Sequence, residues 1–188
     1  MKLIDIHSPQ DIKPLTIDDL KDLAKQMRAA IINYTSTIGG HVGPNLGDVE
    51  ALIGVHYVFD APKDKIVIDV SHQDFVHKML TGRVDAFLDE AKYDDVSGYS
   101  EPSESAHDFF CIGHTSTSVS LACGLAKARD LADENYNVIA VIGDGSLSGG
   151  EALEGLDFAK ELNGNLIVVV NDNEMSIAEN HEKFKVVT

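Results

Sequence analysis

The sequence contains no tryptophan, only two cysteines, and aromatic residues at just 6% of its 188 positions. Few aromatics beside fifteen glycines and many aliphatic residues favour an α/β layer fold over a β-sandwich. Cys111 and Cys123 lie too far apart for a CxxC redox pair and have no zinc-ligand spacing. Their apolar or small neighbours predict two buried, reduced thiols.

Positive charge is also scarce, because 15 Lys and Arg stand against 31 Asp and Glu, which gives a net charge of −16. Such a surface repels phosphate backbones and anionic lipids, so nucleic acid and membrane surfaces are poor partner hypotheses. No apolar run approaches the length of a membrane span, and the first ten residues lack the pattern of a signal peptide. We expect a soluble, cytoplasmic protein.

The length suits one hydrophobic core, and therefore one domain over residues 1–188. Apolar periodicity and capping residues predict helices from Thr16 to before Gly39, over 47–59, from about 72 to Gly82, over 115–131 and over 149–161. Continuous apolar runs predict strands over 66–70, 138–142 and 166–170. Residues 92–108, rich in Ser, Asp, Glu, Gly and Pro, are predicted to form a surface loop.

Strands with no polar alternation, connected through a helix, predict a parallel sheet flanked by helices. Ligands of such sheets bind beyond the carboxyl ends of the strands. Two polar motifs follow strands there, Gly143-Asp-Gly-Ser146 after the second and Asn171-Asp-Asn-Glu-Met175 after the third. The glycines permit a close backbone approach to a phosphate.

Magnesium prefers oxygen ligands shared between protein groups, water and substrate phosphates. Asp144 offers a carboxylate, Asn173 an amide oxygen and Met175 a main-chain carbonyl. The chain between Asp144 and Asn173 has the length of one strand-helix-strand excursion, which places both at neighbouring strand ends. A Gly-Asp-Gly alone is most often a plain turn, but its pairing with the Asn motif favours a magnesium and diphosphate site.

These two motifs resemble the thiamine diphosphate signature of transketolase-like enzymes, and most closely that of 1-deoxy-D-xylulose-5-phosphate synthases. Further stretches from about residue 32 to 181 resemble the same family in the same order. They are Gly40-His-Val-Gly-Pro-Asn-Leu-Gly47, His56-Tyr-Val-Phe59, His72-Gln-Asp-Phe-Val-His-Lys78, Leu80-Thr-Gly-Arg83 and Gly113-His-Thr-Ser-Thr-Ser118.

The resemblance implies a thiamine diphosphate-binding fold with a magnesium ion and a set of cofactor contacts. Asp144, Asn173 and the Met175 carbonyl would hold the metal, and Gly145 and Ser146 would lie against the diphosphate. The other implied cofactor contacts are His72, Gly113, His114 and Thr115. His41 would act as a catalytic proton-transfer or substrate-orienting group.

Four other polar residues are predicted to lie outside the cofactor site. His56 and His77 are predicted to be structural, because no ligand set is complete around them. Glu151 and Glu154 are predicted to be solvated or to lie at a dimer interface, in keeping with a homo-oligomer. The sequence departs from the family at Ser71, where Gly is common, and at Pro44-Asn45, where small residues are common.

By resemblance, the complete enzyme would transfer a two-carbon unit from pyruvate to glyceraldehyde 3-phosphate, giving 1-deoxy-D-xylulose 5-phosphate for isoprenoid and thiamine biosynthesis. Its pyrimidine-binding and C-terminal domains have no counterpart in these 188 residues. Three alternatives remain open: a fragment or shortened copy of the synthase, one subunit of a split enzyme, or a non-catalytic interaction module on the same fold.

Overall fold

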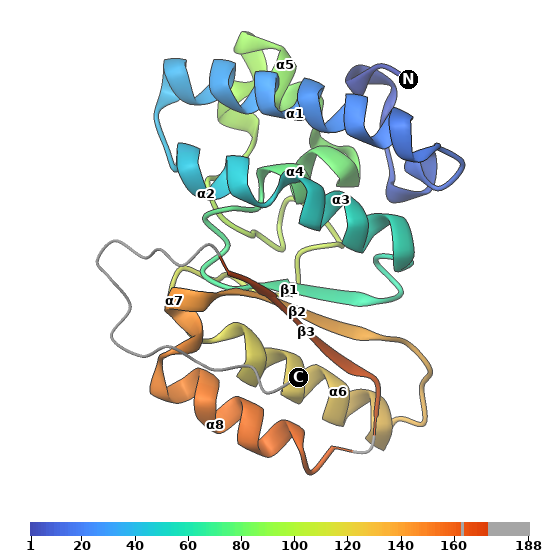
Figure 1. Cartoon of the computed structure of the whole chain (residues 1–188), viewed down its shortest axis with the longest axis vertical. Helices are drawn as coiled ribbons and strands as arrows, with labels where there is room; N and C mark the ends of the chain where they lie inside the picture. Colours follow the sequence, from blue (N-terminus) through green and yellow to red (C-terminus); the bar gives the residue numbers. More distant parts are fainter. Residues whose placement is uncertain (163, 173–188) are drawn as a thin grey trace.

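A three-stranded parallel sheet lies between two layers of helices in the computed structural model, which describes residues 1–162 and 164–172 (Figure 1). The strands are β1 (Lys65–Ile68), β2 (Val138–Gly143) and β3 (Leu166–Asn171), hydrogen-bonded in the order β1-β2-β3. The register pairs Lys65 with Val138 and Gly143 with Asn171. The predicted parallel sheet flanked by helices is confirmed.

The helices on one face of the sheet come from the first half of the described chain (Figure 1). They are α1 (Ile17–Ile38), α2 (Val42–Gly47), α3 (Val49–Val58), α4 (Phe75–Lys78) and α5 (Asp85–Leu88), with the turns η1 (Leu3–Asp5), η2 (Pro9–Ile12), η3 (Met79–Arg83) and η4 (Glu90–Asp95). The other face carries α6 (Ser118–Leu131) and α8 (Gly150–Ala159), while α7 (Asp144–Leu147) starts where β2 ends (Figure 1).

Alternating residues of the strands divide the core between the two helical layers, because successive strand side chains point to opposite faces. Ile66 and Ile68 pack in the cluster that includes α1 and α3. Val67 and Ala140 pack in the cluster that includes α6 and α8. Both faces are apolar, which explains why the strands read as continuous apolar runs.

The first long helix forms as predicted from its ends. The Thr16 hydroxyl accepts a hydrogen bond from the Asp19 amide, the Asp19 carboxylate accepts one from the Thr16 amide, and together these form a capping box. The helix ends at Gly39, whose φ of 89° lies in the left-handed region that favours glycine.

The helical stretch after β1 also ends where predicted, at Gly82. This residue has a φ of 92°, and a Cβ atom there would lie 2.9 Å from the His7 carbonyl oxygen. Glycine is therefore required twice, by the backbone conformation and by the close approach of the N-terminal segment.

Two expectations need correction. Most of residues 92–108 are exposed or half-buried, as expected of a surface loop, but the segment begins within η4, and Tyr93, Val96 and Asp108 are buried. Cys111 is exposed, whereas Cys123 is buried as predicted, and both thiols are free. Within the described part of the chain, no helix is long and apolar enough to cross a membrane.

Candidate functional site

The carboxyl ends of β2 and β3 lie side by side and deliver the two polar motifs to one edge of the sheet. Gly143 pairs with Asn171, so Asp144 and Asp172 follow from neighbouring strand ends. Asp144 is the first residue of α7 and is half-buried. Asn173 and Met175, the other predicted magnesium ligands, lie outside the described residues. Among those described, no group of three or more His, Cys, Asp or Glu side chains could hold a metal.

The loop that precedes α6 contacts the loop that follows β2. The hydroxyl oxygens of Thr115 and Ser146 lie 2.6 Å apart, and the Ser116 hydroxyl donates to the Ser146 carbonyl oxygen at 2.7 Å. A Cβ atom on Gly149 would collide with the Ser116 side chain, so the two loops fit closely. The structure thus brings together two predicted cofactor residues, Thr115 and Ser146. Their hydroxyls, with Gly145 between Asp144 and Ser146, offer the small polar groups that a diphosphate needs.

Asp69, at the end of β1, anchors the loop before α6. Its buried carboxylate accepts hydrogen bonds from the amides of Ser116 and Ser118, at 3.0 and 2.9 Å. Ser116 has a φ of 70°, which the Asp69 contact helps to hold. The exposed residues Gly113, His114 and Thr115 precede this anchor, so Asp69 fixes where they emerge. Asp69 is absent from the site residues predicted from the sequence, although its position directly after a buried strand was a signal for it.

His41, which precedes α2, and His72, which follows β1, lie next to each other. Their rings meet edge to face with centroids 5.0 Å apart. His41 is exposed, whereas His72 is half-buried, and its buried Nδ1 has no hydrogen-bond partner among the residues that the structure describes. Burial, assisted by the nearby His41, lowers the pKa of His72, and Asp69 only partly opposes this. A neutral imidazole with an uncommitted nitrogen can accept a proton.

Ser71 links the His72 segment to the loop before α6. Its backbone has a φ of 65°, which explains why glycine is common at this position in the family it resembles. The buried Ser71 hydroxyl donates to the Ile112 carbonyl and accepts from the Ser100 amide, at 3.3 and 3.0 Å. The serine therefore adds two contacts that a glycine would lack.

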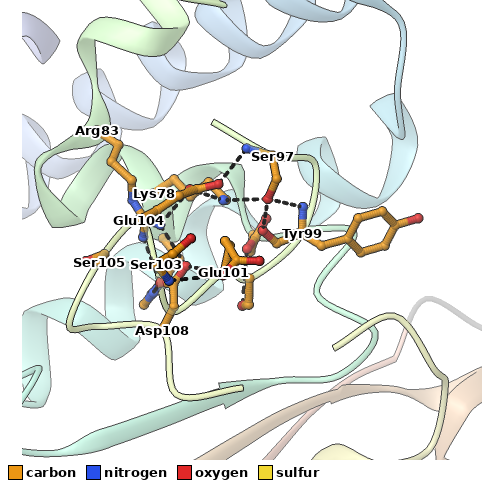
Figure 2. Close-up of polar contacts among 12 residues, drawn as sticks. Lys78, Arg83, Ser97, Tyr99, Glu101, Ser103, Glu104, Ser105 and Asp108 are labelled. Carbon is orange, nitrogen blue, oxygen red and sulfur yellow. Dashed lines mark hydrogen bonds and ion pairs between the residues drawn. The ribbon is translucent and has the colours of Figure 1, made fainter. Parts of the chain in front are cut away.

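A network of buried charges holds residues 97–108 against α4 and η3 (Figure 2). Lys78 is fully buried, and its Nζ donates to Glu104 Oε2 at 2.6 Å. Arg83 donates to both carboxylate oxygens of Asp108, at 2.7 and 2.8 Å. Burial opposes ionisation of Asp108, but the hydrogen bonds from Arg83 and His77 hold its pKa well below the ordinary value. This pairing explains how the polar side chain of Asp108 is buried within an otherwise largely exposed segment.

The same network presents Tyr99 beside His41. The Ser97 amide donates to Glu104, and the Ser97 hydroxyl donates to the Tyr99 carbonyl at 2.6 Å. Figure 2 shows the Tyr99 ring pointing away from the network. It lies 6.2 Å from the His41 ring, centroid to centroid, and both line a pocket of about 300 Å³. Among the residues described, the walls of this pocket carry no Lys or Arg.

His56 and His77 lie in the buried interior. Their ring nitrogens are 2.9 Å apart, and His77 Nε2 lies 3.0 Å from Asp108 Oδ1. Burial lowers the pKa of both histidines. Glu151 and Glu154 are exposed on α8, where a solvated or interfacial role remains the prediction.

Solved structures of transketolases superpose on this chain, which shows that it has the α/β fold of these proteins. Campylobacter jejuni transketolase superposes with a TM-score of 0.74 at 20% identity, covering 88% of this chain and 30% of that one. A mutant transketolase from Pichia stipitis gives a TM-score of 0.71 at 20% identity, over 86% and 28% of the two chains.

Comparison of the amino-acid sequence with known proteins identifies one family. Residues 3–185 match the family description "1-deoxy-D-xylulose-5-phosphate synthase". The synthase of Pelotomaculum thermopropionicum is 53% identical over 175 residues, and that of Dictyoglomus turgidum 52% over 180. These alignments cover 93% and 96% of this chain but 28% and 29% of the relatives. The chain belongs to the 1-deoxy-D-xylulose-5-phosphate synthase family and spans less than a third of the length of these relatives.

Proposed function

We propose that this chain is the diphosphate-binding part of an enzyme that makes 1-deoxy-D-xylulose 5-phosphate from pyruvate and glyceraldehyde 3-phosphate, with release of carbon dioxide. Family membership over residues 3–185 carries the proposal. The contact between Thr115 and Ser146 beside Asp144 supports it, because both loops belong to the expected cofactor site. The enzyme would work in the cytoplasm as a homo-oligomer and would use no nucleic acid or membrane partner.

The proposed cofactors are thiamine diphosphate and Mg²⁺. Asp144 would bind the ion with Asn173 and the Met175 carbonyl, while Gly113, Thr115, Gly145 and Ser146 would face the diphosphate. His114 and His72 would lie toward the thiazolium. Bound thiamine diphosphate supplies the carbanion and the electron sink of the reaction. The protein residues orient it, exclude water and move protons.

Proton movement would fall to the His41 and His72 pair. The lowered pKa of His72 keeps its imidazole neutral near neutral pH, and its buried Nδ1 makes no hydrogen bond within the described part of the chain, so this nitrogen is free to act as a general base. His41 is exposed and lines the adjacent pocket, where it can reach a substrate oxygen. That pocket has no cationic wall in the described part of the chain, so the phosphate of the acceptor would bind elsewhere.

The proposal divides the cleft between this chain and a pyrimidine-binding domain. That domain would come from the rest of a longer protein or from a partner chain, as in a split enzyme. Both arrangements agree with the 28% and 29% coverage of the synthases.

The test supplies uniformly carbon-13-labelled pyruvate and unlabelled glyceraldehyde 3-phosphate to the assembled enzyme with thiamine diphosphate and Mg²⁺. Mass spectrometry should find labelled 1-deoxy-D-xylulose 5-phosphate and labelled carbon dioxide in equal amounts. A parallel reaction replaces pyruvate with a ketose phosphate, the donor of a transketolase. Product from the ketose donor alone would assign a transketolase activity instead and overturn the proposal.

A further inference from the structure

Asn45 connects the backbones that carry the two histidines of the proposed site. It lies in α2 and is fully buried, although residues 41–44 before it are exposed. Its amide Nδ2 donates to the carbonyl oxygens of His41 and His72, at 2.7 and 2.8 Å. Its Oδ1 accepts from the Phe75 amide at 3.1 Å. Both donors and the acceptor of the amide are thus used.

The backbone at both histidines is irregular, so a side-chain connection matters there. Gly39 and Gly40 precede His41 with φ of 89° and 118°. Val70 and Ser71 precede His72 with φ of 58° and 65°. Glycine adopts positive φ readily, so Gly39 and Gly40 leave the His41 segment flexible, whereas the strained Val70 and Ser71 persist only when surrounding contacts hold them. Asn45 supplies contacts to both segments from one rigid, buried group.

The orientation of the amide is determined by its partners. Two carbonyl oxygens require N–H donors on one side, and the Phe75 N–H requires an acceptor on the other. A rotated amide would face oxygen against oxygen, which costs the full desolvation of the buried groups. The spacing of the two carbonyls, and with it the 5.0 Å separation of the His41 and His72 rings, therefore depends on this amide.

We propose that Asn45 is a positioning residue that holds His41 and His72 at a fixed spacing, so that they act as one pair at the proposed cofactor site. The proposal rests on the proposed function for the role of the pair, but the spacing itself is a property of this chain. Because Asn45 is fully buried, it would act through the two histidine segments rather than on substrate or cofactor directly.

A matched comparison comes from Asp64, which joins two chain segments at the opposite end of the sheet. This buried carboxylate accepts from the Asp60 amide at 2.7 Å and from the Asn137 amide and side chain at 2.7 and 3.0 Å. Asp64→Ser and Asn45→Ser each remove a buried group with three hydrogen bonds. Only Asn45→Ser removes the connection between the histidine segments.

The experiment measures deuterium exchange at the imidazole C2 position against pH by mass spectrometry, which gives the titration midpoint of each histidine. His41 lowers the pKa of His72, so His41→Ala should raise the His72 midpoint in the otherwise unchanged chain. When the chain also carries Asn45→Ser, His41→Ala should raise the His72 midpoint by no more than half as much, because the two rings no longer keep their spacing. In the Asp64→Ser background the rise should persist.

A full His41-dependent rise in Asn45→Ser, or its equal loss in Asp64→Ser, would overturn the proposal. Asn45→Asp provides a second variant, since it keeps the side-chain volume but removes both N–H donors and should behave as Asn45→Ser does. Unfolding of both Asn45 variants beside a folded Asp64→Ser would assign Asn45 to fold stability and also overturn it.

The measurement needs no cofactor, so its failure is distinct from failure of the proposed function. In the turnover assay, Asn45→Ser should lower kcat on the order of a hundredfold, the effect of a small misplacement of catalytic groups, with thiamine diphosphate affinity retained. Unchanged kcat beside a lost His41–His72 coupling would contradict the catalytic part of the proposal.

Discussion

At the residue scale, the proposed magnesium site depends most on Asp144, the only carboxylate in its predicted ligand set. Asp144→Ala should abolish Mg²⁺-dependent thiamine diphosphate binding in the assembled enzyme, because neutral oxygens alone bind this ion weakly. Isothermal calorimetry at fixed Mg²⁺ measures the loss. Asp157→Ala, which removes an exposed carboxylate from α8, is the control and should bind normally. Unchanged affinity in Asp144→Ala would remove the metal assignment.

His41 is expected to serve turnover rather than cofactor binding. It is exposed, lies beside His72 and lines the pocket next to Tyr99. His41→Ala in the assembled enzyme should leave thiamine diphosphate affinity nearly intact and lower turnover by roughly a hundred- to ten-thousand-fold, the usual contribution of a positioned acid or base. Steady-state kinetics with pyruvate and glyceraldehyde 3-phosphate test this. Turnover at the level of the unsubstituted enzyme would make His41 structural.

Two buried carboxyl groups make the folded chain sensitive to pH. Burial raises the pKa of Asp74 to about 7 and that of Asp48 to about 6, with Lys78 opposing at Asp74 and the Asn171 contact opposing at Asp48. The unfolded chain releases these protons near pH 4, while the folded chain retains them. Stability contributed by these groups therefore falls as pH rises from about 4 to 7.

Asp74→Asn should remove most of the loss of stability that Asp74 causes as the pH rises. It keeps an acceptor for the Ser100 hydroxyl but has no proton to release. Urea unfolding should show the variant more stable than the parent chain by a few kcal/mol at pH 8, on the order implied by a pKa raised this far, and no more stable at pH 4. An equal difference at both pH values would show that Asp74 is not protonated in the folded chain.

At the element scale, local signals predicted the long helices and the strands. The Thr16 cap and Gly39 define α1, and the apolar runs locate β2 and β3. These features depend on residues that are close together in the sequence. Composition predicted a surface loop over 92–108 but missed its few buried positions, because burial of a polar residue such as Asp108 depends on distant partners. Lys78 and Arg83 neutralise Glu104 and Asp108, and composition alone cannot reveal that pairing.

The same distinction applies to the candidate site. The family resemblance implied that Thr115 and Ser146 both contact the cofactor, and the structure brings their hydroxyls together at one edge of the parallel sheet. The resemblance did not predict the supports of the site, Asp69 and Asn45, because each acts through hydrogen bonds to the backbone of other segments. Such contacts leave no periodic pattern in the sequence.

At the scale of the whole molecule, β3 is an edge strand within the described sheet. Its Val170 is 43% exposed, and on α8 Phe158 is 44% and Leu153 38% exposed. A sheet edge beside exposed apolar side chains favours pairing with another chain segment. We therefore expect the purified chain to associate with itself or with the part that completes the enzyme.

The chain purified alone should fold but should not turn over pyruvate. Its sheet carries apolar clusters on both faces, which is enough for an independent fold. Catalysis is different, because the family resemblance implies that the cofactor would lie across a cleft and that a glutamate of the pyrimidine-binding domain would activate it. Half of that cleft leaves the cofactor open to water and lacks the preorganised charges that stabilise the transition state. Carbon dioxide release should therefore appear only after a pyrimidine-binding domain is added, in material that mass spectrometry shows to contain one chain at the start.

Rapid release by the solitary chain would mean that a carboxylate of its own activates the cofactor. Glu154→Gln would then be the first variant to examine, with Glu151→Gln as its neighbour control on the same exposed helix.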